Sequence, residues 1–299
     1  MSSSRAAALG RARAWIVTAY VVAAAAGITA ALLLTSPSSH ALVRAAIGDL
    51  AATIAVFTFS AAFRNSSFYD AYWSVWPPVA GFTWLLSAPP GVDRVRQAVA
   101  LGLCTLWGVR LTYNWARGFS GLHHEDWRYV EIARKTGRAY WLASFLGIHL
   151  VPTAQTFAGS IGLYVALTAT CRPFGALDLL AAAVTLGAIV CEAVADQQLF
   201  RFMRRPSRKP DEPISEGLWA YCRHPNYFGE ITFWWGLFGF GLAADPGPWR
   251  SMIVGPSVIT LMVVFVSVPL MEKRQLERRP AFAESMRTTS MIIPWFRKT

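Results

Sequence analysis

The polar residues of this 299-residue chain that are best suited to bind a ligand stand directly before an apolar, aromatic segment. The stretch "EGLWAYCRHPNYFGEITFWWG" begins at Glu216 and combines a cation, hydrogen-bond donors and a carboxylate. Fixed cations and donors of this kind suit a phosphorylated ligand. The polar side chains concerned are Arg223, His224, Asn226, Tyr227 and Glu230.

A second polar group precedes this stretch. Glu192 and Asp196 are four residues apart, about one helical turn, and a basic run follows them. Such a run could present cations to ligand phosphates. Alternatively, it only enforces membrane topology or contacts anionic lipid. The cations of the run are Arg201, Arg204, Arg205, Arg208 and Lys209.

A lone carboxylate precedes the apolar sequence "AYWSVWPP". A carboxylate beside hydrocarbon is unfavourable unless it is paired, protonated or functional, so Asp70 is a candidate proton donor. The alternative is helix capping, in which Ser66, Ser67 or Asp70 accepts backbone N–H groups.

A polar stripe occurs in "WGVRLTYNWARG", where Arg110, Tyr113, Asn114 and Arg117 recur at spacings of three and four along one helical face. Tyr113 could donate its phenol proton into a cavity. Two alternatives remain, a structural ion pair between Arg110 and Asp70 and a position for Tyr113 at the membrane interface.

Metal binding is not expected. His123 and His124 are adjacent and therefore point to different faces of a helix, which makes them a poor ligand pair. Glu125, Asp126 and Arg128 favour a charge network within a loop. The cysteines lack a CxxC spacing and mostly lie in apolar runs, which is typical of small buried hydrophobic residues. They are Cys104, Cys171, Cys191 and Cys222.

The elements that must position these residues are membrane helices. The chain is 54% hydrophobic and 15% charged, whereas soluble domains carry about 25% charged residues. Spans need roughly 20 apolar residues, and the sequence predicts an all-α polytopic bundle of seven to eight of them. "WPP" and "HLVPTAQ" predict kinks or re-entrant segments in the third and fifth. The candidate ranges are 14–35, 42–63, 71–88, 97–116, 141–170, 176–200, 228–244 and 251–271.

The basic residues predict the orientation. With the N-terminus in the cytoplasm, 22 of the 28 basic residues fall on that side, and five, Arg44, Arg94, Arg96, Arg172 and Arg250, fall on the other. Positive charge favours the cytoplasmic side, so both termini are expected there. The net charge of +11 then reflects topology rather than nucleic-acid binding. The cytoplasmic cations lie in 1–13, at Arg64, and in 117–138, 201–223 and 273–298.

The same polar segments carry a family resemblance. "GLWAYCRHPNYFGE" resembles the C-terminal motif of the steroid 5-alpha-reductase family, more closely its bacterial branch of membrane proteins. Further resemblance lies in "NSSFYDAYWSVWPP", "RLTYNWARG", "EDWRY", "ADQQLFRF" and "MEKRQLERRPAFAESMRTTSMIIPWF". It covers about residues 60–297 and implies two domains, an N-terminal two-helix segment (1–63) and a catalytic domain (64–299).

The resemblance implies an NADPH-dependent enzyme, in the bacterial plasma (inner) membrane, that reduces a carbon–carbon double bond conjugated to a ketone in a sterol-like lipid. Asn226 would hold the nicotinamide amide, and Asp196 would lie beside the cofactor. The preference for NADPH over NADH and the oligomeric state stay open. The remaining cofactor-binding residues implied are Arg201, Arg204, Arg223, His224, Tyr227, Glu230, Arg274 and Arg278.

The implied catalytic pair is a tyrosine with a carboxyl group near the substrate ketone, and Tyr113 and Asp70 are the best matches. Asp70 is shorter than the family's glutamate, and Glu192 stands where an asparagine is common. Asp70 and Glu125 both stay open as the acid partner. Hydride addition to an enone builds charge on the carbonyl oxygen, and a phenol bonded to a carboxyl group in a dry cavity stabilises that charge.

Two other functions stay open. Prenylcysteine and phospholipid methyltransferases share an "RHP-x-Y-x-G" segment and bind S-adenosylmethionine, but they generally carry two adjacent glutamates where this chain has Glu272 and Lys273. A non-enzymatic lipid transporter or lipid-binding protein would also explain the spans. In each case the partners expected are the bilayer and a hydrophobic lipid, without nucleic acid.

Overall fold

The computed structural model describes residues 3–209 and 211–297, and the regular elements in these ranges are helices. Five helical segments there are long and apolar enough to cross a membrane, which confirms a polytopic helical membrane protein. Lys298, one of the basic residues used to predict orientation, lies outside the described ranges. The five segments are Ala6–Leu34, Ala41–Ala62, Trp127–Thr168, Ala176–Met203 and Trp249–Arg278.

Three of the eight predicted spans are not among these five, for different physical reasons. Helix α3 (Tyr72–Leu86) has only 15 residues, fewer than a straight span needs. Helix α4 (Arg94–Gly118) is long enough but carries four arginines. Helix α10 (Pro225–Ala244) begins with polar residues and is rich in tryptophan, which prefers the membrane interface.

The chain forms two compact units. Unit 1 comprises residues 1–87 and 107–157, and unit 2 comprises residues 88–106 and 158–299. The boundary that follows residue 106 falls inside α4. The predicted domain boundary between residues 63 and 64 falls within unit 1, and this division stays a prediction.

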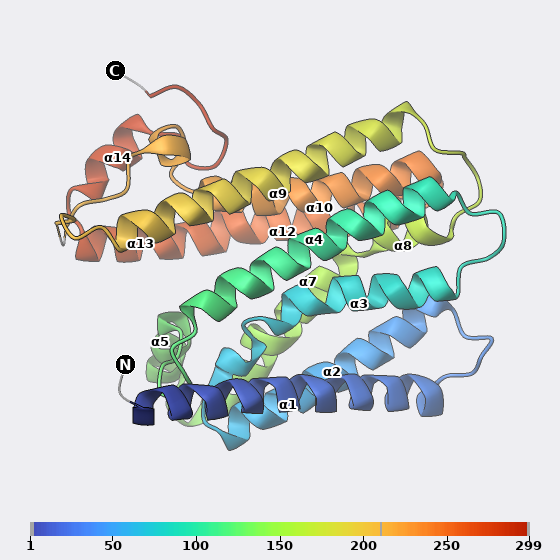
Figure 1. Ribbon diagram of the computed structural model, residues 1–299, viewed down its shortest axis with the longest axis horizontal. Coiled ribbons are helices and arrows are strands. Elements are labelled where there is room, and N and C mark those ends of the chain that lie inside the picture. Colours follow the sequence, from blue (N-terminus) through green and yellow to red (C-terminus); the bar gives the residue numbers. More distant parts are fainter. Residues whose placement is uncertain (1–2, 210, 298–299) are drawn as a thin grey trace. The chain divides into compact units, whose positions relative to one another are not determined.

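Unit 1 starts with an antiparallel helix pair, α1 (Ser3–Leu34) and α2 (Ala41–Ala62) (Figure 1). The two helices approach closely at Gly27 and Gly48, where a Cβ atom on Gly27 would lie 2.8 Å from the Gly48 carbonyl oxygen. Small residues permit this approach in membrane helices. His40 caps α2, because its Nδ1 accepts a hydrogen bond from the Leu42 amide at 3.3 Å.

The predicted fifth span consists of consecutive helical elements within the apolar segment Trp127–Thr168, and other short helices belong to the rest of unit 1. The π-helix η3 precedes Pro152, so this segment is irregular, as its proline predicts. Pro77 and Pro78 lie inside α3. The remaining elements are η1 (Ser66–Tyr69), α5 (Trp127–Thr136), η2 (Gly137–Ala139), α6 (Tyr140–Ala143), η3 (Ser144–Leu150) and α7 (Val151–Gly159), whose last two residues belong to unit 2.

Unit 2 is built around α9 (Ala176–Met203) and α10, which lie side by side (Figure 1). Gly236 makes this packing possible, because a Cβ atom there would collide with Thr185 of α9. The other elements are α8 (Ile161–Thr168), η4 (Gly217–Ala220), α11 (Trp249–Met252), α12 (Val254–Met262), η5 (Val263–Ser267), α13 (Val268–Arg278) and α14 (Phe282–Thr288).

The RHPN motif is the sequence of residues 223–226, and a buried ion pair lies at the opposite end of unit 2 from it. Arg96 Nε and Nη2 donate to the two carboxylate oxygens of Asp178 at 2.7 and 2.9 Å. The guanidinium also donates to the carbonyl oxygens of Arg172 and Pro173. Because every charged atom has a partner, this pair is a structural clamp between α4 and α9.

Candidate functional site

The RHPN motif of unit 2 is held against the C-terminal half of α9. Gly217 has a φ of 59°, a conformation that favours glycine, and it starts η4. The Leu218 amide donates to the Gln198 side chain at 2.9 Å, and Trp219 Nε1 donates to the Ala195 carbonyl at 3.0 Å. These bonds place the start of α10 near the part of α9 that carries Asp196.

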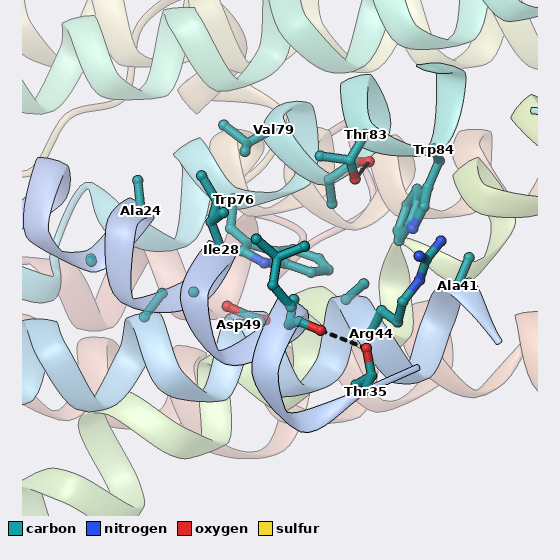
Figure 2. Close-up of a pocket in the computed structure, with 18 of the residues that line it drawn as sticks. Ala24, Ile28, Thr35, Ala41, Arg44, Asp49, Trp76, Val79, Thr83 and Trp84 are labelled. Atoms are coloured by element: carbon teal, nitrogen blue, oxygen red, sulfur yellow. Dashed lines mark hydrogen bonds between the residues drawn. The ribbon is translucent and has the colours of Figure 1, made fainter. Parts of the chain in front are cut away.

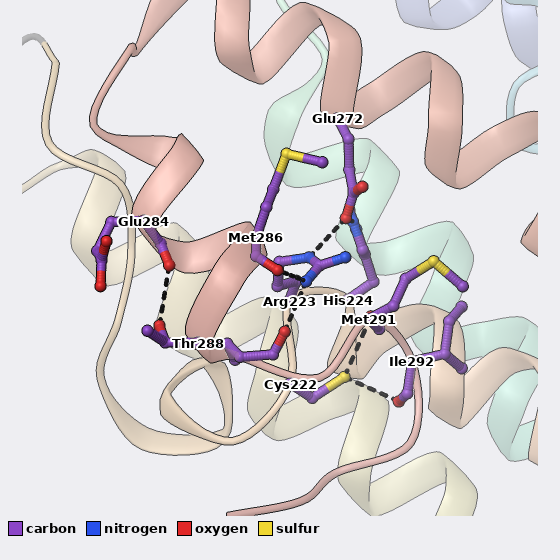
Figure 3. Close-up of polar contacts among 10 residues, drawn as sticks. Cys222, Arg223, His224, Glu272, Glu284, Met286, Thr288, Met291 and Ile292 are labelled. Carbon is purple, nitrogen blue, oxygen red and sulfur yellow. Dashed lines mark hydrogen bonds and ion pairs between the residues drawn. The ribbon is translucent and has the colours of Figure 1, made fainter. Parts of the chain in front are cut away.

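Arg223 and His224 converge on one carboxylate (Figure 3). Arg223 Nε donates to Glu272 Oε1 at 2.7 Å, and His224 Nε2 lies 3.1 Å from the same oxygen. Arg223 Nη1 donates to the Met286 and Thr289 carbonyls at 2.9 and 2.6 Å. Three of the five N–H donors of Arg223 are therefore used inside the protein. The prediction that Arg223 and His224 contact a cofactor stays a prediction, and both side chains join α10 to α13.

The C-terminal segment is attached to the same motif. The Arg223 amide donates to the Ser290 carbonyl at 2.8 Å, and Cys222 Sγ donates to the Ile292 carbonyl at 2.8 Å (Figure 3). The Trp295 amide donates to the Tyr221 carbonyl at 3.0 Å. Burial raises the pKa of the Cys222 thiol to about 11, which makes this cysteine unreactive at neutral pH.

The first turns of α10 carry the other predicted cofactor residues. Asn226 is partly exposed, and its Oδ1 accepts from the Tyr227 amide at 3.1 Å. The Tyr227 ring is nearly parallel to the His224 ring, with centroids 5.6 Å apart. Glu230 Oε1 accepts from Trp234 Nε1 at 2.8 Å. The Asn226 amide nitrogen has no hydrogen bond within the part of the chain that the structure describes, so it can donate to a ligand at the edge of the motif.

Exposed cations gather at the same end of unit 2. Arg201 and Arg204 end α9, and the Arg204 guanidinium lies 3.9 Å from the Phe200 ring centre. Burial and the nearby charges of Arg208 and Arg278 lower the pKa of Arg279. Helix α13 carries the two remaining predicted cofactor-binding residues, of which Arg278 is exposed and Arg274 is partly buried. A concentration of positive charge from two chain segments suits a ligand with several phosphates.

In unit 1 the predicted catalytic residues are not bonded to each other. The Tyr113 side chain is 65% exposed, with the Arg117 guanidinium 6.0 Å from its ring centre. Asp70 instead accepts a hydrogen bond from the hydroxyl of Tyr129 at 2.7 Å. Burial raises the pKa of Asp70 to about 6. The pairing of Tyr113 with Asp70 as catalytic residues stays a prediction.

A side chain does cap a helix in the segment before α3, but it is not one of the predicted residues Ser66, Ser67 and Asp70. Asn65 caps η1 by accepting from the Ser67 amide at 2.8 Å, and its own amide donates to the carbonyls of Leu122 and His124. Helix α3 has no side-chain cap, so Asp70 does not cap it.

The predicted loop network of Glu125, Asp126 and Arg128 exists in part. Asp126 caps α5 and forms an ion pair with Arg128 at 2.9 Å. Glu125 has other partners, since it accepts from the Ser66 amide at 2.6 Å and from the Tyr140 hydroxyl at 3.1 Å. Glu125 therefore organises the loop around η1.

A buried carboxyl–phenol pair in unit 1 was missed by the sequence reasoning. Asp49 of α2 is 2% exposed, and the Tyr72 hydroxyl donates to its Oδ1 at 2.9 Å. Asp49 Oδ2 has no hydrogen-bond partner among the residues that the structure describes. The available signal was a single carboxylate in the middle of the predicted 42–63 span, where an ionisable residue indicates function by default.

Asp49 and Tyr72 line a partly open cavity of about 470 Å³ between α1, α2 and α3 (Figure 2). This volume lies in the range of small-molecule sites. Its walls are mainly apolar, with Ala and Ile side chains from α1, Ala side chains from α2, and indoles from α3. Among the lining residues are Ala24, Ile28, Ala31, Ala45, Trp76, Val79 and Trp84.

Residues 56–289 match a protein family described as "Protein of unknown function (DUF1295)". The chain belongs to the DUF1295 family. A Schizosaccharomyces pombe protein described as "Uncharacterized protein C594.04c" is 27% identical over 241 residues, which are 73% of this chain and 70% of the yeast protein. No solved structure matches the chain.

The DUF1295 match separates the candidate residues into two groups. It includes the RHPN motif, Asp70, Tyr72 and Tyr129, and it starts after Asp49. The cavity in unit 1 is thus lined by a helix inside the family match, α3, and by α1 and the first half of α2 outside it.

Proposed function

We propose that this DUF1295 protein is a membrane-embedded oxidoreductase that uses NADPH to reduce a carbon–carbon double bond conjugated to a ketone in a steroid-like or other lipid. The observation that carries the proposal is the Asp49–Tyr72 pair in an apolar cavity. The resemblance of the RHPN motif to the steroid 5-alpha-reductase family supports it.

The proposed chemistry needs a proton donor at the ketone. NADPH, when bound, would supply the hydride that adds to the β-carbon of the enone. As the double-bond electrons shift toward the carbonyl, its oxygen gains negative charge, and a hydrogen bond from the Tyr72 hydroxyl stabilises that charge. For this step the Asp49 carboxyl group is protonated and donates to the Tyr72 oxygen, which leaves the phenol hydrogen for the ketone. Transfer of that hydrogen to the carbonyl oxygen gives the enol, Asp49 returns a proton to the phenolate, and tautomerisation of the enol places a proton on the α-carbon and completes the reduction.

Asp49 and Tyr72 replace Tyr113 and Asp70 as the leading catalytic candidates in this proposal. They combine a phenol bonded to a carboxyl group with a mainly apolar cavity. Tyr129 and Asp70 form a second such pair, which is the alternative site. Tyr113 has the weakest support of the three tyrosines because its side chain is exposed.

The RHPN end of unit 2 is the proposed cofactor site. The Asn226 amide would bind the nicotinamide carboxamide, with Asp196, Tyr227 and Glu230 around it. Arg201, Arg204, Arg274 and Arg278 would bind phosphates. Arg208 and Arg279 join this group. Burial lowers the pKa of Arg279 and the charges of Arg208 and Arg278 lower it further, so a bound phosphate would stabilise these neighbouring cations. A group of several arginines favours NADPH, which has one more phosphate than NADH.

The membrane orientation proposed with this function has both termini in the cytoplasm. It includes seven to eight membrane helices, since α3, α4 and α10 join the five candidate spans as shorter or more polar members of the bundle. The basic RHPN end of unit 2 would then face the cytoplasm of the cell, as a soluble nucleotide requires. The membrane proposed is the bacterial plasma membrane.

Nucleotide binding by the purified protein in detergent tests the proposal. Thermal unfolding is followed with NADPH, NADH or S-adenosylmethionine, since a ligand of the folded state raises the unfolding temperature. We expect the largest rise with NADPH, and NADPH consumption on addition of a 4-en-3-one steroid. A rise with S-adenosylmethionine alone would identify a methyltransferase. No response to any of the three would favour a lipid transporter or binding protein.

A further inference from the structure

The cavity of unit 1 has a second polar end. Arg44 of α2 lines it, is partly buried, and its guanidinium has no hydrogen bond or ion pair with any residue in the described ranges. Figure 2 shows the Arg44 side chain extending along the cavity in the direction of Trp84. The cavity is partly open and Arg44 is partly exposed, so its guanidinium can reach a ligand there, and a negatively charged group of that ligand would form a charge-assisted hydrogen bond with it.

Helix geometry adds to the positive potential at this end. Arg44 lies in the first turn of α2, which begins at Ala41. The N-terminus of a helix carries a partial positive charge that favours anions. The cation and the helix end therefore act in the same direction, and no carboxylate other than Asp49 lines the cavity.

The two polar ends are separated by a fixed length of apolar wall. Arg44 and Asp49 are five residues apart on α2, which corresponds to roughly 7.5 Å along the helix axis. Between and around them the walls are formed by Ala45, Gly48 and Ile28. Within the described residues, no hydrogen bond or ion pair of the Arg44 guanidinium is found at one end, and Asp49 Oδ2 has no hydrogen-bond partner at the other.

We propose that the cavity binds a lipid that carries an anionic group, such as a carboxylate, on Arg44 and an oxygen function at Asp49 and Tyr72, with its apolar body between them. The assignment of the oxygen function to a ketone rests on the proposed function; the anionic end does not. The substrate class is therefore an acidic enone lipid rather than a neutral one.

Equilibrium binding separates this ligand class from a neutral lipid. The probes are a 4-en-3-one steroid with a side-chain carboxylate and the methyl ester of the same steroid, in an uncharged detergent. Binding is followed by the fluorescence of tryptophan, since Trp76 and Trp84 line the cavity. We expect the carboxylate to bind about tenfold more tightly than the ester, as about 1.4 kcal/mol implies.

Two variants test the role of Arg44. Arg44→Gln should abolish the preference for the steroid carboxylate over its methyl ester, because it weakens the binding of the carboxylate alone. Arg250→Gln should leave this preference unchanged. Arg250 is a matched control because it is an arginine on α11 outside the cavity. Equal affinity of the wild type for acid and ester would overturn the proposal. So would an equal loss for both ligands in Arg44→Gln, because that pattern indicates a general structural role.

A third arm distinguishes an acidic substrate from a membrane lipid. Phosphatidylglycerol is added in competition with the steroid carboxylate. Weak competition supports the proposal, whereas full displacement that depends on Arg44 would assign this residue to a lipid headgroup and overturn it. Carboxylate-selective binding without NADPH consumption would contradict the reductase function and leave the acidic ligand standing. The two hypotheses thus fail separately.

Discussion

The two units each bury a carboxylate next to an aromatic or cationic partner, but the two carboxylates differ in how many bonds they form. Glu272 in unit 2 receives Arg223 and His224 on one oxygen, and Arg223 continues to two main-chain carbonyls. Asp49 in unit 1 receives only Tyr72, and its second oxygen is unpartnered among the described residues. A buried polar atom without a partner lowers stability, so its retention suggests a ligand. The comparison separates a carboxylate that holds the fold from one that is available to a substrate.

Removal of the Glu272 carboxylate should have the largest effect on stability. Glu272→Ala leaves the Arg223 guanidinium and His224 without their shared acceptor. Breaking a buried ion pair in this way typically costs about 3–5 kcal/mol. Thermal unfolding in detergent should show a large decrease in the unfolding temperature. The matched change at the other carboxylate, Asp49→Asn, should shift it little, and equal losses for the two variants would contradict the comparison.

Removal of the Tyr72 hydroxyl should have the largest effect on turnover. Tyr72→Phe keeps the ring and deletes the proton donor, and loss of a general acid typically lowers rates by about 10²-fold or more. Steady-state reduction of a 4-en-3-one steroid measures this, with nucleotide-induced thermal stabilisation as the check on folding. Tyr113→Phe and Tyr129→Phe are the matched controls. If Tyr113→Phe or Tyr129→Phe is the inactive variant instead, the cavity is not where the proton is donated.

Substitution of Asn226 should lower the affinity for the cofactor and leave the affinity for the lipid unchanged. Asn226→Ala removes one amide donor from the edge of the RHPN motif, and the loss of a single hydrogen bond to a ligand is on the order of 1 kcal/mol. The dissociation constant for NADPH should rise severalfold, measured by titration, while binding of the steroid ester is unchanged. An unaltered NADPH affinity would remove Asn226 from the cofactor site.

Asp70 gives the smallest expected effect, and it depends on pH. Its pKa is raised to about 6 by burial, above the usual value near 4 in an unfolded chain. The stabilising contribution of the protonated form is therefore complete below about pH 4 and is lost as pH rises through 6. Because the side chain is partly exposed, we expect a change of about 1 kcal/mol between pH 5 and 8. Asp70→Asn should remove this pH dependence of the unfolding temperature, and a wild type that becomes more stable over this interval would contradict the assignment.

The sequence was sufficient to predict the helical segments and the positions of polar residues along the chain. It was insufficient to predict which polar side chains bond to each other. Hydrophobic length predicted the five candidate spans, and the proline of "HLVPTAQ" predicted the irregular helix before α7. Asp70 and Tyr129 are 59 positions apart, and Arg223 and Glu272 are 49 apart, so their bonds depend on helix packing that a pattern does not contain.

Local pattern also has limits in the choice of tyrosine. Tyr113 was chosen for the helical stripe that it shares with Arg110 and Arg117, and such a stripe does not show which face of the helix is buried. The catalytic role of Tyr113 stays a prediction. The length of α3 was overestimated because its apolar sequence continues beyond the turn at Ser87. The sequence did contain the signal for Asp49, a charge within a span, and the interpretation gave it no weight.

The attachment of the C-terminal segment limits how this protein can vary. Five of its contacts with Cys222 and Arg223 use carbonyl oxygens of the segment, and a sixth joins the Trp295 amide to the Tyr221 carbonyl. Main-chain atoms are present whichever amino acid occupies a position, so substitutions there leave the contacts available, whereas a shortened chain removes them. Natural selection on this segment is therefore expected to preserve its length more strictly than its composition.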